Sequence, residues 1–177
     1  PPSPQGSVWG IHNKYFLPLV LAVTLLAFLP ALQNKFVNLD DTQYVLKNEV
    51  IKKISAENLK AVFSEQFVGN YQPVTMLSYM NDHALFGMKP FGWHLVNLLF
   101  HLLGTGLVYL IILRISGNTL TTFITSLLFG IHPLHVESVA WVSERKDVLY
   151  GFFFLWALYV YVSAPTQKAE GRTLSPQ

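Results

Sequence analysis

The sequence predicts an all-α membrane protein with about four membrane-spanning helices and one long polar loop. Of its 177 residues, 51% are apolar and only 12% are charged, whereas typical soluble domains carry about 25% charged residues. Several apolar runs approach the roughly 20 residues that a helix needs to cross a bilayer. Because a surface so poor in charge would aggregate in water, the composition excludes an ordinary soluble domain.

The first predicted span covers residues 15–32. Pro18 falls in its first turn, where a missing N–H group is harmless, and Pro30 marks its end. The flanks of the chain, residues 1–14 and 164–177, are rich in Pro, Ser and Gly and predict disordered tails. The membrane region is therefore expected within residues 15–163.

A polar loop of residues 33–91 follows and carries most of the charge. Within it, Ser55 begins a pattern typical of a short helix that ends near Phe63. Residues 73–86 predict a second helix, with Pro73 at its first position. Both helices are amphipathic, so we expect them to lie on the membrane surface with their apolar faces toward the lipid. A loop of this length between spans is usually functional.

Three more spans are predicted at residues 92–115, 120–131 and 148–162. Two glycines, Gly104 and Gly106, lie in the middle of the first of these. A polar helical turn of residues 135–147 separates the last two, and the final span is rich in aromatic residues, as interface-anchored helices often are. The Lys and Arg residues compared across the spans give a tie, so charge bias does not set the orientation. On one side are Lys14, Arg114, Lys168 and Arg172, and on the other are Lys35, Lys89, Arg145 and Lys146.

Charge and cysteine content narrow the classes of function. The formal net charge is +2 and no run of Lys or Arg exceeds two residues, which gives no argument for a nucleic-acid partner. The chain has no cysteine, which excludes disulfides, thiolate metal sites and cysteine nucleophiles. Any chemistry must come from carboxylate, imidazole, guanidinium or hydroxyl groups.

The first candidate site is the acidic pair Asp40 and Asp41, just after the first span. Two adjacent carboxylates near a bilayer surface repel each other, an arrangement suited to a general base or to a cationic partner. The alternative is a solvated turn in which Asp caps a helix. A second candidate is the polar stripe of His94, Asn97 and His101 at helical spacing. It indicates either a functional bundle interior, as in a transporter, or interhelical hydrogen bonding.

The third candidate is the charged segment of residues 132–147, between two apolar spans. Arg145 has the forked donors that bind phosphate or diphosphate, while the alternative is an interfacial loop with internal salt bridges. His132 and His135 with a carboxylate would be a weak metal site, because no third His or Cys lies nearby in the sequence. No metal ligand is therefore assigned.

Three segments together resemble a known family. They are residues 36–42 (FVNLDDT), residues 71–75 (YQPVT) with 92–101 (GWHLVNLLFH), and residues 132–149 (HPLHVESVAWVSERKDVL). Their order and spacing resemble the N-terminal membrane region of the transmembrane-and-TPR O-mannosyltransferases, and more closely their bacterial relatives, within the GT-C glycosyltransferase superfamily. The resemblance covers residues 15–162, and its last motif is long and specific.

The resemblance implies an inverting transferase that takes a mannose-like sugar from a polyprenyl-phosphate donor and passes it to an acceptor, often a protein hydroxyl. It implies that Asp40 or Asp41 is the catalytic base, and that Arg145, with His132 or His135, binds the donor phosphate. Supporting roles are implied for Glu137, Asp147, Tyr71 and His94. A divalent metal is left open. The implied location is a bacterial inner membrane with the acidic loop in the periplasm.

The chain departs from the family pattern in two ways. Gln72 stands where eukaryotic members usually have a basic residue, which weakens any phosphate role there. The family has many more spans followed by TPR repeats, so this chain resembles a piece that would be inactive alone. The rival interpretation is a non-enzymatic scaffold or anchor that holds a TPR protein at the membrane, in which case the acidic pair is a turn.

Overall fold

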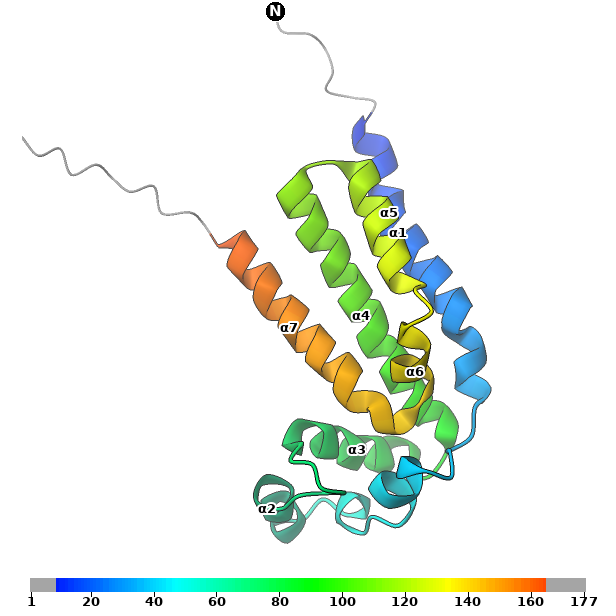
Figure 1. The fold of residues 1–177 in the computed structure, drawn as a ribbon, viewed down its shortest axis with the longest axis vertical. Coiled ribbons are helices and arrows are strands. Elements are labelled where there is room, and N and C mark those ends of the chain that lie inside the picture. The colour runs from blue at the N-terminus through cyan, green and yellow to red at the C-terminus, as the bar shows by residue number, and fades with distance from the viewer. Residues whose placement is uncertain (1–8, 165–177) are drawn as a thin grey trace, which may run out of the picture.

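The computed structural model describes residues 9–164, with side chains from Tyr15 onward, and this part is helical with no β-strand. Four helices lie side by side along most of its length: α1 (Trp9–Phe28), α4 (Pro90–Ser116), α5 (Thr119–Gly130) and α7 (Arg145–Ser163). A layer of shorter helices closes one end of this bundle (Figure 1). The prediction of an all-α chain is confirmed for the described residues.

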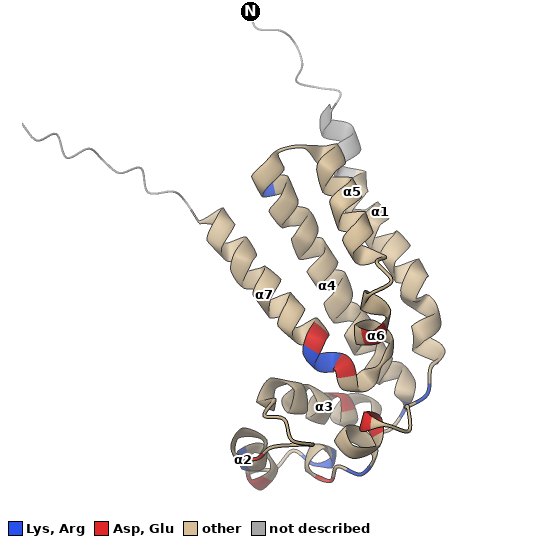
Figure 2. Cartoon of the chain, viewed as in Figure 1, with Lys and Arg blue, Asp and Glu red and all other residues tan. Residues whose placement is uncertain are grey.

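Two helical stretches, Tyr15–Gln33 and Pro90–Ser116, are long and apolar enough to cross a membrane. The helix α5 is also apolar but has only 12 residues, and α7 opens with three charged residues. Figure 2 shows that charged residues gather at the end of the bundle where the short helices lie, while the long helices are almost free of charge. This distribution suits a bundle whose uncharged length lies in lipid.

The helix α4 is the centre of the bundle, because it packs against α1, α5 and α7. The helices α1, α4 and α5 approach closely at Gly130, where an added Cβ atom would lie 2.2 Å from the hydroxyl oxygen of Thr24 and 3.0 Å from a methyl carbon of Thr105. At Gly104 an added Cβ would only touch Leu155, at 3.7 Å, and at Gly106 it would meet no described atom within 4 Å. The tight crossing therefore lies at the end of α5, among α1, α4 and α5, and not at the two central glycines of α4.

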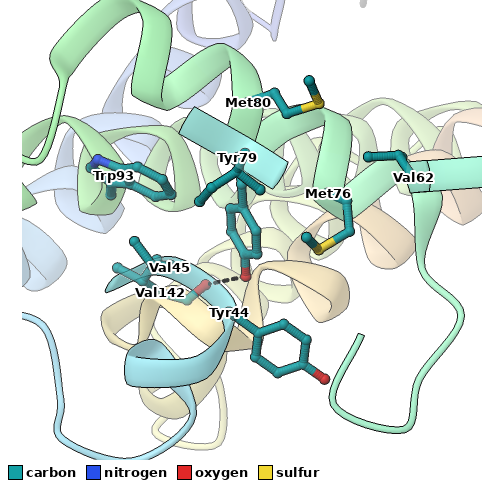
Figure 3. Packing of buried hydrophobic residues seen from close by; sticks show 9 residues of the cluster. Tyr44, Val45, Val62, Met76, Tyr79, Met80, Trp93 and Val142 are labelled. Atoms are coloured by element: carbon teal, nitrogen blue, oxygen red, sulfur yellow. Dashed lines mark hydrogen bonds between the residues drawn. The ribbon is translucent and has the colours of Figure 1, made fainter. Parts of the chain in front are cut away.

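The layer below the bundle contains α2 (Ala56–Ser64) and α3 (Pro73–Phe86). The turns η2 (Thr42–Leu46) and η3 (Val50–Lys52) complete it. Their apolar side chains share one core with residues of the bundle (Figure 3). This core consists of Tyr44, Val45, Ile51, Val62, Met76, Tyr79, Met80, Trp93 and Val142. The layer is thus packed onto the bundle through Trp93 of α4 and Val142.

The amphipathic helices were expected to place their apolar faces on lipid, and the structure corrects this. Val62 of α2 and Met76 of α3 are 1% and 0% exposed because they pack against protein. The residues that cover these apolar faces come from η2 and from Trp93. The apolar periodicity of α2 and α3 does not show whether lipid or protein covers such a face. The predicted starts of both helices are confirmed: the Ser55 hydroxyl accepts a hydrogen bond from the Asn58 amide at 3.2 Å, and Pro73 opens α3.

Several boundaries differ from the sequence-based expectation. The helix α1 begins at Trp9, so residues 9–14 are helical where a disordered tail was expected, and Pro18 lies inside the helix and not in its first turn. The predicted tails at residues 1–8 and 165–177 lie outside the described residues. The polar turn before the last span resolves into α6 (His135–Ala140), η4 (Val142–Glu144) and the start of α7.

Candidate functional site

The carboxylate of Asp41 is buried and accepts hydrogen bonds from two distant segments. Its Oδ2 accepts the amide of Val37 at 2.8 Å, and its Oδ1 accepts both the amide of Ser143, at 2.9 Å, and the Ser143 hydroxyl. The side chain is 0% exposed. Asp41 therefore ties the loop after α1 to η4, 102 residues further along the chain.

Asp40, the neighbouring acid, has different surroundings. It is half-buried, and its carboxylate makes no hydrogen bond or ion pair with residues 15–164, whose side chains the structure describes. The two carboxylates of the acidic pair are thus divided: Asp41 is used to join two segments, and Asp40 is left with its oxygens available. Of the two, Asp40 is the carboxylate that has no internal partner to give up before it accepts a proton.

Arg145, at the start of α7, is fully buried and surrounded by protein acceptors. Its Nη2 donates to Asp82 Oδ2 at 2.7 Å and to the Trp93 carbonyl at 2.8 Å. Its Nη1 donates to the Ser78 hydroxyl at 3.3 Å, and its Nε donates to the Asn97 side-chain carbonyl. All three guanidinium nitrogens therefore face protein acceptors. The donor-phosphate role expected of Arg145 stays a prediction, and it would require these donors to exchange a protein acceptor for the phosphate.

The buried acid Asp82 is the ionic partner of Arg145. Burial raises the pKa of Asp82, while the charge of Arg145 and its hydrogen bond act in the opposite direction. The Asp82 Oδ1 atom has no hydrogen-bond partner among the described residues. The Tyr79 ring lies over the same guanidinium, 5.5 Å from its central carbon. Burial also raises the pKa of Tyr79, whose hydroxyl donates to the Val142 carbonyl at 2.9 Å.

The polar stripe on α4 faces the inside of the bundle. Asn97 and His101 are both buried, and each bonds to a neighbouring segment. The Asn97 amide donates to the carbonyls of Trp141, at 2.8 Å, and Ser138, at 3.4 Å. A ring nitrogen of His101 lies 2.8 Å from the Gly130 carbonyl. These contacts are the interhelical bonds that the sequence offered as one alternative. His94 is also buried and lies within electrostatic reach of Asp41 and Arg145.

The two histidines of the charged segment lie on or beside α6. His132 is exposed, and its Nδ1 accepts the Leu134 amide at 3.2 Å. His135 is half-buried, with its ring centroid 4.7 Å from that of Phe129 and 5.2 Å from that of His101. Burial lowers the pKa of His135, and the charge of His132 lowers it further.

A groove of about 380 Å³ runs beside α6 between α4 and α7. Its walls are mostly apolar, including Phe100, Phe152 and Leu155. Its polar lining includes His135 and a pair in which the Ser138 hydroxyl donates to Asp147 at 3.1 Å. Within the described range no three His, Cys, Asp or Glu side chains are grouped so as to hold a metal ion.

The remaining predicted residues are separate from this cluster. Tyr71 is 60% exposed, and its hydroxyl donates to the Phe63 carbonyl at 3.1 Å, which joins the end of α2 to the start of α3. Glu137 on α6 is exposed. The Gln72 amide is buried without a hydrogen-bond partner among the described residues. The structure thus brings Asp41 and Arg145 to one end of the bundle through Ser143, and it leaves Tyr71 in the outer layer.

Comparison with known proteins identifies the relatives of this chain. Protein O-mannosyl-transferase TMTC2 of Mus musculus is 39% identical over 105 residues, which is 59% of this chain and 13% of that protein. Protein O-mannosyl-transferase TMTC1 of Homo sapiens is 31% identical over 173 residues, which is 89% of this chain and 19% of that protein. The chain belongs to this family of protein O-mannosyl-transferases. The resemblance stated from the motifs is confirmed.

The chain spans less than a fifth of the length of these transferases, 13% of the mouse TMTC2 protein and 19% of the human TMTC1 protein. A third member of the family, TMTC3 of Homo sapiens, is 29% identical over 159 residues, or 84% of this chain. No protein-family model and no solved structure matches.

The sequence analysis of this O-mannosyl-transferase homologue missed two residues of the site, Asp82 and Ser143. Asp82 lies on the inner face of α3 with Tyr79, three residues earlier, and an acid on a predicted apolar face is a signal that could have identified it. Ser143 gave no such signal. Its position follows from the fold of η4, which the sequence showed only as part of a polar turn.

Proposed function

We propose that this chain is the N-terminal part of a GT-C-type transferase that moves a mannose-like sugar from a polyprenyl-phosphate donor to a protein hydroxyl with inversion. The names of its homologues support O-mannosyl transfer. In this proposal α1, α4, α5 and α7 each cross the membrane, the bundle lies in a bacterial inner membrane, and the layer of α2 and α3 faces the periplasm. The charge gathered at that end of the bundle supports placing the layer in water, outside the lipid.

The observation that carries the proposal is the division of the acidic pair. Asp40 would act as the general base, because its carboxylate has no partner among the described residues, while Asp41 is fixed by Val37 and Ser143. Asp40 would take the proton of the acceptor hydroxyl as that oxygen forms a bond to the anomeric carbon of the sugar. The bond from that carbon to the phosphate oxygen breaks on the opposite side, and the polyprenyl phosphate leaves with the electron pair.

For the donor phosphate we propose His132 and His135 as contacts, ahead of Arg145. His132 is exposed and its Nε2 atom makes no hydrogen bond with the described residues. Both rings belong to the segment beside the apolar groove between α4 and α7. Arg145 contributes by holding the site together, since its donors are engaged by Asp82, Asn97, Ser78 and Trp93.

A second candidate function is a non-enzymatic membrane anchor for a TPR protein. It is favoured by one observation, that Asp41 and Arg145 are both buried in internal hydrogen bonds. Under this alternative the acidic pair serves only to close the loop, and no residue of the pair is needed for sugar transfer.

The test is transfer from a labelled polyprenyl-phosphate mannose by the full-length protein in proteoliposomes. We expect Asp40→Asn to lower transfer by about 10²–10⁴-fold, the range of general base catalysis, with normal expression and folding. The matched control is Glu65→Gln, which changes an exposed acid just after α2 and should leave transfer unchanged. Full activity of Asp40→Asn would exclude the base and favour the anchor.

A further inference from the structure

Three elements meet at the guanidinium of Arg145. The helix α3 contributes Asp82 and the Ser78 hydroxyl, and α4 contributes Asn97 and the Trp93 carbonyl. Both members of the ion pair are almost fully removed from solvent, with side-chain exposures of 0% and 1%. The planar fork of an arginine fixes the directions of its acceptors, so this side chain sets how the outer layer sits against α4 and α7.

A buried ion pair is a poor source of net stability, because desolvation of the two charges offsets most of their attraction. Its best-supported use is to fix one arrangement among several. Here the apolar core shared by α2, α3 and Trp93 already attaches the layer to the bundle. The ion pair of Arg145 and Asp82 fixes the orientation of the layer on the bundle, because its hydrogen bonds are directional and nonpolar contacts are not.

The segment from Trp141 to Arg145 links this ion pair to the acidic pair Asp40 and Asp41. The carbonyl of Trp141 is held by Asn97, and the carbonyl of Val142 is held by Tyr79. Arg145 itself is held by Asp82. The residue between these anchors, Ser143, gives its amide and its hydroxyl to Asp41.

Asp40 precedes Asp41 in the same short turn of helix, so its position follows that of Asp41. A displacement of Ser143 would move Asp41, and with it the neighbouring carboxylate. In a site where the base and the acceptor hydroxyl must meet at hydrogen-bond distance, a shift of about 1 Å costs on the order of 10²-fold in rate.

We propose that Asp82 and Asn97 are positioning residues for Asp40, acting through Arg145 and the segment from Trp141 to Ser143. The proposal rests on the proposed function, in which Asp40 is the base. It assigns to Asp82, on the outer layer, a role in the rate of sugar transfer although its carboxylate contacts neither the acceptor nor the donor.

The test compares rate and stability for three changes in the full-length protein. Asp82→Asn should lower kcat by about 10–10²-fold, change KM for the labelled donor by less than about threefold, and lower the unfolding temperature. The double variant Asp82→Asn with Arg145→Gln removes both charges, so no lone buried charge remains. It should recover much of the stability while kcat stays low.

Ser143→Ala provides the third change, because it leaves the ion pair intact and removes only the hydroxyl bond to Asp41. It should lower kcat by about tenfold with little loss of stability. The pH at which kcat/KM rises should stay the same in all three variants, since the base itself is unchanged. The matched control is Glu49→Gln, which breaks the exposed pair with Lys52 and should leave kcat unchanged.

The outcomes separate the two proposals. Full activity of Asp40→Asn would overturn the proposed function itself. Loss of activity in Asp40→Asn together with wild-type kcat in Asp82→Asn and Ser143→Ala would overturn only the positioning role. Recovery of kcat in parallel with stability in the double variant would show that the ion pair serves folding alone. If Asp82→Asn does not fold, the double variant and Ser143→Ala decide the matter.

Discussion

Asp82 on α3 and Arg145 at the start of α7 lie 63 residues apart in sequence, and their side chains meet at 2.7 Å in the interior. This contact marks the place where the outer layer joins the bundle. The acidic pair lies at the same end of the bundle, because Asp41 accepts a hydrogen bond from Ser143, two residues before Arg145. Three charged residues between the apolar spans, Asp41, Asp82 and Arg145, therefore join the loop to the helices.

Truncation of the buried acid should destabilise the protein strongly. Asp82→Ala leaves the Arg145 guanidinium buried without its ionic partner, which costs about 3–5 kcal/mol. The measurement is the free energy of unfolding in detergent. Glu49→Gln, which breaks an exposed ion pair, should cost less than about 1 kcal/mol. Equal effects of the two substitutions would contradict the assignment of Arg145 and Asp82 as a buried pair.

A methyl group at the tight helix crossing should disturb the packing there. Gly130→Ala places a Cβ atom 2.2 Å from the Thr24 hydroxyl oxygen, so the Thr24 side chain must shift or α1 and α5 must move apart. Overpacking of this kind costs about 1–3 kcal/mol, to be measured by thermal unfolding in detergent. Gly106→Ala is the matched control, because its Cβ meets no described atom within 4 Å and alanine favours the helix. A Gly106→Ala variant less stable than Gly130→Ala would show that the crossing lies elsewhere.

Stability should fall as the pH drops below the ordinary pKa of histidine. Burial lowers the pKa of His135 in the folded protein, so the unfolded chain binds its proton more readily. The neutral His135 ring therefore contributes fully to the free energy of unfolding above the pKa of the unfolded chain, about 6.5. This contribution is lost as the pH falls from there toward the lower pKa of the folded protein. Unfolding measured between pH 8 and pH 5 should show a shallower fall in His135→Gln than in the wild type. An unchanged slope would mean that His135 is not buried as the structure has it.

The sequence predicted the helices well because their signals are local. Long apolar runs located α1 and α4, and a capping serine and an initial proline located the starts of α2 and α3. The orientation of α2 and α3 was wrong, since an apolar face looks the same whether it meets lipid or Trp93. The start of α7 shifted to Arg145 because a polar residue enters a helix when tertiary contacts satisfy its side chain.

The candidate site was predictable only in outline. The motifs pointed to the acidic pair and to the charged segment near Arg145, which the structure places at the same end of the bundle, but they could not distinguish the surroundings of Asp40 from those of Asp41. That difference depends on a partner 102 residues away, Ser143, which carries no recognisable signal of its own. The same holds for Arg145, whose burial depends on Asp82, an acid that no motif included.

The most direct test compares sugar transfer and unfolding for Asp40→Asn and Asp41→Asn in the full-length protein. An Asn at position 41 keeps only one acceptor oxygen for the Val37 and Ser143 donors, so that variant should lose both stability and activity. Asp40→Asn should lose transfer while its unfolding stays like that of the wild type. Retained transfer in Asp40→Asn, or a loss of stability equal to that of Asp41→Asn, would contradict the division of the acidic pair.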